Sequence, residues 1–249
     1  MLTGDEVGAL LGEHVIRSTT GERLVATTIV SSSLLGKIAA EYGVRYAETL
    51  TGFKWIMKAG SGPDGPGDAG DRLLYGYEEA LGYSVGSEAG LPVHDKDGIG
   101  AALTVAGIAA RARRDGRTLL DLLDDQARRY GLHATSQLSA RVSDLSLIAG
   151  AMARLRAAPP TELGGRKVES VEDLSLGTGG LPPTEGLRYL LSGGARVVVR
   201  PSGTEPKLKC YLEVVVPVTG EVADARARAV QDLKALKRDL AAALDLPGA

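Results

Sequence analysis

The sequence has few of the residues from which disulfide, metal and membrane proteins are built. Its 249 residues include one cysteine and three histidines, and Lys plus Arg total 29 against 31 for Asp plus Glu. A single cysteine excludes a disulfide framework and fits a reducing, cytoplasmic location. The net charge of -2 gives no support for a nucleic-acid partner, which favours a basic excess. No apolar run reaches membrane-spanning length and no signal peptide opens the chain, so we expect no membrane partner.

Alternating strand and helix patterns dominate the first half of the chain. A β-branched run at 23–30 is followed by a helical pattern at 34–42, a second strand at 44–49 and a helix that opens at 51. Another strand is expected at 72–78, and it is followed by helices at 99–114 and 117–130. This order predicts an α/β fold with a parallel sheet and flanking helices.

The two ends of the chain carry further helices. A helix at 4–16, capped by Asp5, has no partner before it in the chain. A helix at 141–157 is broken by a Pro-Pro pair and then a Gly-Gly pair, so we expect a domain boundary there. Short strands follow, and then a terminal helix at about 221–244 whose predicted buried stripe comprises Val230, Leu233, Leu236, Leu240 and Leu244. The Gly/Pro-rich segment 60–70 is expected to be a surface loop.

The most informative stretch is Arg-Pro-Ser-Gly-Thr-Glu at 200–205, which lies between two β-branched runs. Arg200 offers a planar fork that can bind two phosphate oxygens, and Ser202 and Thr204 offer hydroxyl donors. Gly203 lets the backbone approach an anion closely. These residue types are also ordinary turn residues, so their chemistry alone leaves an anion site and a plain hairpin about equally favoured. Cys210, in the following strand pattern, is expected to be a buried apolar residue.

The string from Arg200 to Lys207 resembles the phosphate-binding loop in the last domain of the phosphohexomutases, the phosphoglucomutase and phosphomannomutase family. The resemblance implies that Arg200, Ser202, Gly203 and Thr204 hold the non-reacting phosphate of a sugar phosphate. Lys207 and Lys209 are two residues apart, so they share one face of a strand and can add charge to that pocket.

A second candidate, Glu78, lies at the predicted end of a strand, where open α/β sheets bind ligands. Its carboxylate can accept hydrogen bonds from sugar hydroxyls, although spacing alone favours a solvated loop glutamate. The surrounding Gly-Tyr-Glu-Glu-Ala-Leu-Gly-Tyr segment resembles the sugar-specificity loop of the same family, usually Gly-Glu-x-Ser-Gly. The resemblance implies that Glu78 binds the sugar. Ala80 replaces the usual serine, as in the branch of phosphoglucomutase-2/phosphopentomutase, which leaves the sugar open.

Two lysines complete the expected site. Thr-Gly-Phe-Lys at 51–54 resembles the family's Thr-Gly-x-Lys loop, and Lys-Asp-Gly at 96–98 resembles its Lys-Asp-Gly segment. The resemblance implies that Lys54 and Lys96 lie close to the transferring phosphate, where an ammonium group can neutralise developing charge or transfer a proton. Either lysine alone would be interpreted as a surface residue.

The family's catalytic serine motif and its Asp-x-Asp-x-Asp-Arg magnesium loop are both absent from the sequence, and we expect no metal site. The resemblance therefore implies the C-terminal half of a phosphohexomutase. Its fold would be a three-layer mixed-sheet sugar-binding domain followed by a smaller α+β phosphate-binding domain. The expected divisions are a terminal helix of a missing domain at 1–20, the sugar-binding domain at 21–135, a helical linker at 136–165 and the phosphate-binding domain at 166–249.

The function expected from this resemblance is that of a phosphosugar mutase, with Mg²⁺ bound outside this chain and a hexose bisphosphate as activator. The partners would be a glucose, mannose or pentose phosphate and a separate N-terminal half. Because the catalytic motifs are absent, we expect no turnover by this chain alone. A non-catalytic sugar-phosphate binding protein and a truncated remnant that binds nothing are the alternatives.

Overall fold

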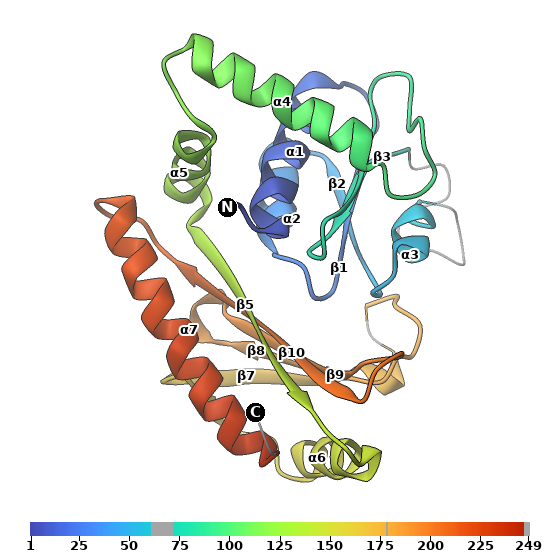
Figure 1. The fold of residues 1–249 in the computed structure, drawn as a ribbon, viewed down its shortest axis with the longest axis vertical. Helices are drawn as coiled ribbons and strands as arrows, with labels where there is room; N and C mark the ends of the chain where they lie inside the picture. Colours follow the sequence, from blue (N-terminus) through green and yellow to red (C-terminus); the bar gives the residue numbers. More distant parts are fainter. Residues whose placement is uncertain (61–71, 178, 247–249) are drawn as a thin grey trace. The chain divides into compact units, whose positions relative to one another are not determined.

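The computed structural model describes residues 1–60, 72–177 and 179–246, and the chain divides into two compact units, Met1–Tyr130 and Gly131–Ala249 (Figure 1). Each unit has its own sheet and its own hydrophobic core. The expected loop at 60–70 lies outside the described residues, apart from Gly60. No helix in the described ranges combines the length and the hydropathy needed to cross a bilayer.

The first unit is a three-layer α/β domain, as the sequence predicts. Its sheet has the order β2-β1-β3-β4, in which β1 pairs in parallel with β2 and β3, and β4 is antiparallel to β3. Helices α1, α2, α4 and α5 contribute to one core, and α3 packs on a second core that includes Leu24 and Ala26 of β1. The strands are β1 Leu24–Thr28, β2 Arg45–Thr49, β3 Leu73–Glu78 and β4 Gly82–Val85, and the helices are α1 Gly4–Ser18, α2 Leu34–Glu41, α3 Phe53–Met57, α4 Gly98–Arg114 and α5 Leu119–Tyr130.

Helix α1 is an integral part of this unit, because its glycines let tyrosine rings approach the helix backbone. A Cβ atom at Gly8 would lie 2.6 Å from the ring of Tyr77, and one at Gly12 would lie 3.0 Å from the ring of Tyr75. The Tyr75 hydroxyl donates a hydrogen bond to the carbonyl of Gly8 (2.7 Å), and the Tyr83 hydroxyl donates one to the carbonyl of Gly4 (3.0 Å). The prediction that residues 1–20 belong to a missing domain is therefore wrong.

The cap of α1 also differs from the prediction. Thr3 is the N-cap, and its hydroxyl accepts a hydrogen bond from the Glu6 backbone, while the Glu6 carboxylate accepts one from the Thr3 backbone. This reciprocal capping box satisfies two backbone donors. Asp5 is instead buried and accepts a hydrogen bond from the backbone N–H of Ser32 at 2.7 Å.

The second unit is an antiparallel sheet with helices on one face. The strand order is β5-β10-β9-β8-β7-β6, and α6 and α7 share the core beneath β10, β9 and β8 (Figure 1). The strands are β5 Leu132–Arg141, β6 Glu162–Leu163, β7 Arg166–Asp173, β8 Leu187–Leu191, β9 Arg196–Pro201 and β10 Lys207–Val216, the helices are α6 Leu145–Ala157 and α7 Val222–Leu244, and short 3-10 turns are η1 Leu174–Leu176 and η2 Ser192–Gly194.

Strand β5 is the main element that the sequence analysis missed. It pairs with β10 along its whole length, from Leu132 opposite Val216 to Arg141 opposite Lys207. The predicted helical linker at 136–165 therefore consists of the end of a sheet strand, helix α6 and strand β6, all within the second unit. The junction between the units follows Tyr130. In α7, Val230 is 49% exposed, so it does not belong to the buried stripe predicted for this helix.

Candidate functional site

The β9–β10 hairpin presents a cluster of cations on the sheet face away from α6 and α7. Leu208 and Cys210 point into the core, so strand alternation places Lys207 and Lys209 on the opposite face. Burial raises the pKa of the Cys210 thiol to about 12. Lys209 lies directly opposite Arg200 of β9.

The strand pairing in this sheet places positively charged side chains directly opposite one another. Lys209 faces Arg200, and Lys207 faces Arg141 of β5. Like charges directly opposite each other destabilise a sheet. Glu205 offsets one of the two pairs, because its carboxylate lies 2.9 Å from Arg141 and 2.6 Å from Lys207. The side chains of Arg200 and Lys209 make no hydrogen bond or close ion pair with any other described residue, and only the more distant charge of Glu205 acts on Lys209. This half-exposed pair of cations can therefore bind an external anion.

The loop between the strands leaves donors accessible next to these cations. The backbone N–H of Ser202 donates a hydrogen bond to the carbonyl of Lys207 (2.8 Å), which closes the hairpin. Gly203 and Thr204 are exposed, and no atom lies within 4 Å of the position a Cβ at Gly203 would occupy. The predicted cradle residues Arg200, Ser202, Gly203 and Thr204 thus lie in one short segment beside Lys209.

In the first unit, the predicted residues gather at the carboxyl edge of the parallel strands. Glu78 ends β3, and the segment that contains Lys54 follows β2. A Cβ at Gly82 would lie 2.7 Å from the Oε1 atom of Glu78, so the glutamate carboxylate packs against the backbone of the next strand. Gly82 therefore helps to set the position of the Glu78 side chain.

The two predicted lysines converge on helix α3. The Nζ atom of Lys96 lies 4.8 Å from the centre of the Phe53 ring and 3.1 Å from Asp95. Lys54, the next residue of α3, has its Nζ atom 5.6 Å from the ring centre of Trp55. Cation–π contacts of this length hold each ammonium group beside an aromatic face. Residues more than 40 positions apart in the chain, Phe53 and Lys96, thus meet at one helix.

The sequence analysis missed a buried polar cluster beside Glu78. The hydroxyl of Ser31 donates to the Glu79 carboxylate and accepts from the Glu79 backbone N–H, both at 3.2 Å. It also lies 2.9 Å from the hydroxyl of Thr28. Ser31 therefore joins the end of β1 to the loop that follows β3. The sequence analysis identified neither this serine nor its contact with Glu79.

Burial governs the ionisation of Glu79. Desolvation raises the pKa of its carboxyl group, and the nearby negative charge of Asp5 adds to that effect, while hydrogen bonds from the Glu79 backbone and from Ser31 oppose it. Two residues further on, Leu81 adopts a left-handed conformation with φ of 65°. A side chain in this region costs roughly 1–2 kcal/mol. Leu81 occupies the position of the second glycine in the usual Gly-Glu-x-Ser-Gly loop.

The described parts of the chain contain no group of three or more His, Cys, Asp or Glu side chains placed to hold a metal ion. These residues therefore do not fit the magnesium site of the mutases, and we assign no Mg²⁺ ligand to them.

Comparison with known families accounts for both units. Residues 3–130 match the α/β/α domain III of phosphoglucomutase/phosphomannomutase, and residues 140–232 match the C-terminal domain IV of the same family. The chain belongs to this family. The first match begins at residue 3, so it includes α1, and the second includes the Arg200 hairpin.

Individual relatives give the same result. The chain is 39% identical over 214 residues to a probable phosphomannomutase of Haemophilus influenzae, a match that covers 85% of this chain and 40% of the relative. It is 29% identical over 243 residues to a phosphopentomutase of Mus musculus, covering 87% of this chain and 38% of the relative. The chain thus spans about two fifths of the relatives that it matches.

A solved structure supports the fold. The open form of parafusin, a phosphoglucomutase from Paramecium, aligns with a TM-score of 0.68 at 21% identity, covering 100% of this chain and 44% of that one. The mixed α/β architecture with two sheets is therefore that of the last two mutase domains.

Proposed function

We propose that this chain is the sugar- and phosphate-binding part of a phosphosugar mutase. The observation that carries the proposal is the Arg200–Lys209 pair, which the β9–β10 register places face to face, with no direct ion pair to either side chain among the described residues. A phosphate dianion between them would offset their repulsion and accept charge-assisted hydrogen bonds. Ser202, Gly203 and Thr204 would supply further donors from the adjoining loop.

The first unit would bind the sugar. Glu78, at the end of β3, would accept hydrogen bonds from neighbouring sugar hydroxyls, and Lys54 and Lys96 would stabilise charge on the phosphate that is transferred. In the whole enzyme, a phosphoserine would give its phosphate to the sugar phosphate. A hexose bisphosphate would form, and its other phosphate would return to the serine. The serine and the Mg²⁺ ligands would lie on an N-terminal half, and the protein would work in the reducing cytoplasm.

Thermal unfolding with glucose 1-phosphate, mannose 1-phosphate and ribose 1-phosphate tests this proposal. We expect at least one ligand to stabilise the chain, by about 2.7 kcal/mol when it is present at 100 times its Kd. Arg200→Ala and Lys209→Ala should abolish the shift. Arg238→Ala, on the exposed surface of α7, is the matched control and should leave it unchanged. The ranking of the three sugars would indicate the substrate.

Complementation separates the proposal from its alternatives. The chain should show no mutase turnover alone, and addition of the N-terminal half of a relative should restore it. Ligand binding without restored turnover would favour a non-catalytic binding protein. No thermal shift with any of the three ligands, together with no complementation, would contradict the proposal and leave a non-binding remnant.

A further inference from the structure

A pocket in the first unit, unrelated to the predicted site, lies between α1, α4 and α5. Its volume is about 510 Å³, within the range of small-molecule sites. Leu10, Ile108 and Leu122 line its apolar part, and polar residues from all three helices line the remainder. Helix α1 begins beside Glu79 and has its last turns at this pocket. At a rise of about 1.5 Å per residue, Arg17 lies roughly 18 Å along the helix from Asp5, so the pocket is separate from the carboxyl edge of the sheet.

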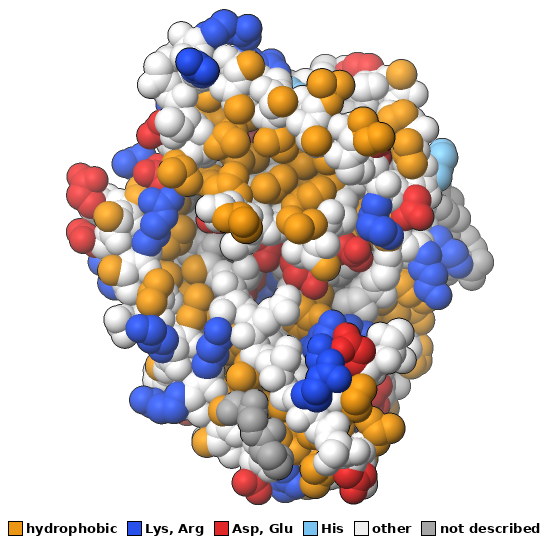
Figure 2. Space-filling model, in the orientation of Figure 1, with side chains coloured by type: hydrophobic (Ala, Val, Ile, Leu, Met, Phe, Trp, Pro, Cys, Tyr) orange, Lys and Arg blue, Asp and Glu red, His pale blue; other side chains and the backbone are white. Residues whose placement is uncertain are grey.

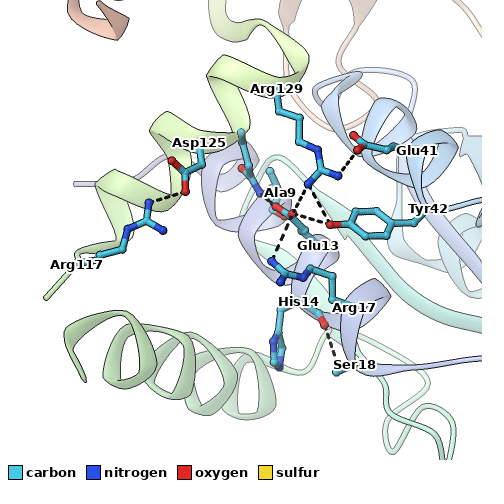
Figure 3. A network of polar contacts seen from close by, with 11 residues as sticks. Ala9, Glu13, His14, Arg17, Ser18, Glu41, Tyr42, Arg117, Asp125 and Arg129 are labelled. Atoms are coloured by element: carbon cyan, nitrogen blue, oxygen red, sulfur yellow. Dashed lines mark hydrogen bonds and ion pairs between the residues drawn. The ribbon is translucent and has the colours of Figure 1, made fainter. Parts of the chain in front are cut away.

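Most of the charges at one side of the pocket neutralise each other. Figure 3 shows Glu13 between Arg129 and Arg17, at 3.9 and 4.0 Å respectively. Arg129 also pairs with Glu41 (Figure 3). The same view shows that Arg117 pairs with Asp125 across the first turns of α5. This side of the pocket therefore has little charge to offer a ligand.

The side formed by α1 and α4 is different. The side chain of Arg111 in α4 makes no hydrogen bond or ion pair with the described parts of the chain, and the side chain of Arg17 has only its 4.0 Å contact with Glu13. His14 lies half-buried near both arginines. Its own burial and then the charges of Arg111 and Arg17 lower the pKa of the imidazole, which favours the neutral form of the ring at pH 7. Two cations and a neutral imidazole together suit a phosphate group.

A buried hydrogen-bond acceptor in the wall of the pocket indicates which group the ligand carries besides the phosphate. Gln126 is 3% exposed, and its Nε2 atom donates to the carboxylate of Glu13 at 2.7 Å and to the carbonyl of Ala9 at 3.3 Å. Both partners are acceptors, so the amide nitrogen must face them. The Oε1 atom is buried and has no hydrogen-bond partner among the described residues. An unmet buried acceptor is costly, and a ligand hydroxyl would satisfy it once the side chains that cover it move aside.

We propose that this pocket is a second binding site, which takes a phosphorylated polyol. The phosphate would lie against Arg111, Arg17 and His14, and a hydroxyl of the polyol would donate to the Oε1 atom of Gln126. Asp115, at the end of α4, also lines the pocket and makes no side-chain hydrogen bond or ion pair with the described residues. Its negative charge weakens anion binding, so its removal should tighten it.

Proton NMR of His14 tests the site directly, because the sequence has only three histidines. The probe is glucose 6-phosphate, titrated into the Arg200→Ala chain so that the hairpin of the second unit cannot contribute. His14→Gln assigns the resonance. We expect a saturable shift of the His14 signal and a higher pKa for the ring with the probe bound, since a phosphate reverses the effect of the two arginines. This result does not depend on the function proposed above, whose failure would leave the His14 response unchanged.

Matched variants decide the outcome. Arg111→Gln should weaken binding at least about tenfold, the loss expected for one charge-assisted hydrogen bond. Arg113→Gln, an exposed change on the same helix outside the pocket, should leave affinity unchanged, and Asp115→Asn should increase it. Inorganic phosphate and glucose should each bind at least about tenfold more weakly than the probe. The proposal is overturned by an absent His14 shift, by equal losses in the two arginine variants, or by inorganic phosphate binding as tightly as glucose 6-phosphate.

Discussion

The hydrophobic cores of the two units contain different polar contacts. In the first unit, the buried Tyr75 and Tyr83 donate hydrogen bonds to the backbone of α1, and the buried Tyr77 donates one to the carboxylate of Asp5. In the second unit, aliphatic side chains fill the space under the sheet, and the buried side chains of Arg196 and Glu213 form an ion pair at 2.7 Å. Its one fully buried tyrosine, Tyr189, has a hydroxyl with no hydrogen-bond partner in the described residues.

This difference extends to the binding residues. Glu78 lies at a strand end, Lys54 in the short helix α3 and Lys96 in a loop, and each is held by a local contact with a glycine, an aromatic ring or an acid. Arg200 and Lys209 lie within paired strands, so the sheet register sets their spacing. The first site therefore depends on close packing and on ionisation, whereas the second depends on backbone pairing.

The largest effect should come from filling the contact between α1 and β3. Gly8→Ala places a methyl group 2.6 Å from the buried ring of Tyr77, and we expect about 1–3 kcal/mol of destabilisation from overpacking. Gly107→Ala, on the exposed face of α4 with no atom within 4 Å of the new Cβ, is the control. It should stabilise the unit by up to about 1 kcal/mol through helix propensity.

Each unit has its own spectroscopic or chemical probe for these measurements. The single tryptophan, Trp55, lies in the first unit, and the single cysteine, Cys210, is buried in the second. Denaturant curves followed by Trp55 fluorescence should shift for Gly8→Ala. Equal midpoints for Gly8→Ala and Gly107→Ala would show that α1 does not pack tightly on the tyrosines.

Removing one buried tyrosine hydroxyl from each unit should change the free energy of unfolding by a smaller amount, and the change should differ between the units. Tyr75→Phe removes a buried hydrogen bond to Gly8, so we expect a loss of about 1 kcal/mol. Tyr189→Phe removes a buried hydroxyl without a partner among the described residues, so its effect should be neutral or stabilising. Trp55 fluorescence measures the first change, and the denaturant dependence of Cys210 thiol labelling measures the second. A clear loss on Tyr189→Phe would mean that this hydroxyl has a partner.

The smallest effect should be the dependence of the first unit's stability on the ionisation of Glu79. Burial raises the pKa of Glu79 in the folded state, so between the unfolded and folded pKa values the native chain binds more protons than the unfolded chain. Its contribution to stability therefore falls as pH rises through that window. Glu79→Gln, which cannot ionise, should become progressively more stable than the parent from about pH 4 upward. Midpoints of Trp55 fluorescence that keep a constant difference across pH would contradict this.

Local sequence signals predicted much of the fold. Hydrophobic periodicity located the helices of the first unit and its alternating strands, and the polar loop between two β-branched runs marked the β9–β10 hairpin. The capping box of α1 was also readable, since Thr3 and Glu6 have the Thr-x-x-Glu spacing. Asp5 was mistaken for the cap because an acid at a helix start usually serves there, whereas this one is drawn inward by the backbone of Ser32.

Strand β5 shows what local signals could not reveal. Its core-facing positions include the small or polar residues Ala134, Ser136 and Ala140, so the apolar alternation is weak. Its hydrogen bonds come from β10, whose residues lie about 75 positions away in the middle of the strand, where Gln137 pairs with Tyr211. Only the folded sheet selects a strand for this segment.

The sequence by itself determined the residue chemistry of the candidate site: an arginine, hydroxyl groups and a glycine in one hairpin, with a glutamate and two lysines elsewhere. Which charges remain available to a ligand was decided by the tertiary structure. The strand register places Arg200 directly opposite Lys209, whereas Lys207 and Arg141 form ion pairs with Glu205. Helix packing likewise leaves Arg111 beside His14. The reason is physical, because a charge is neutralised by its neighbours in space, and a local sequence pattern does not specify those neighbours.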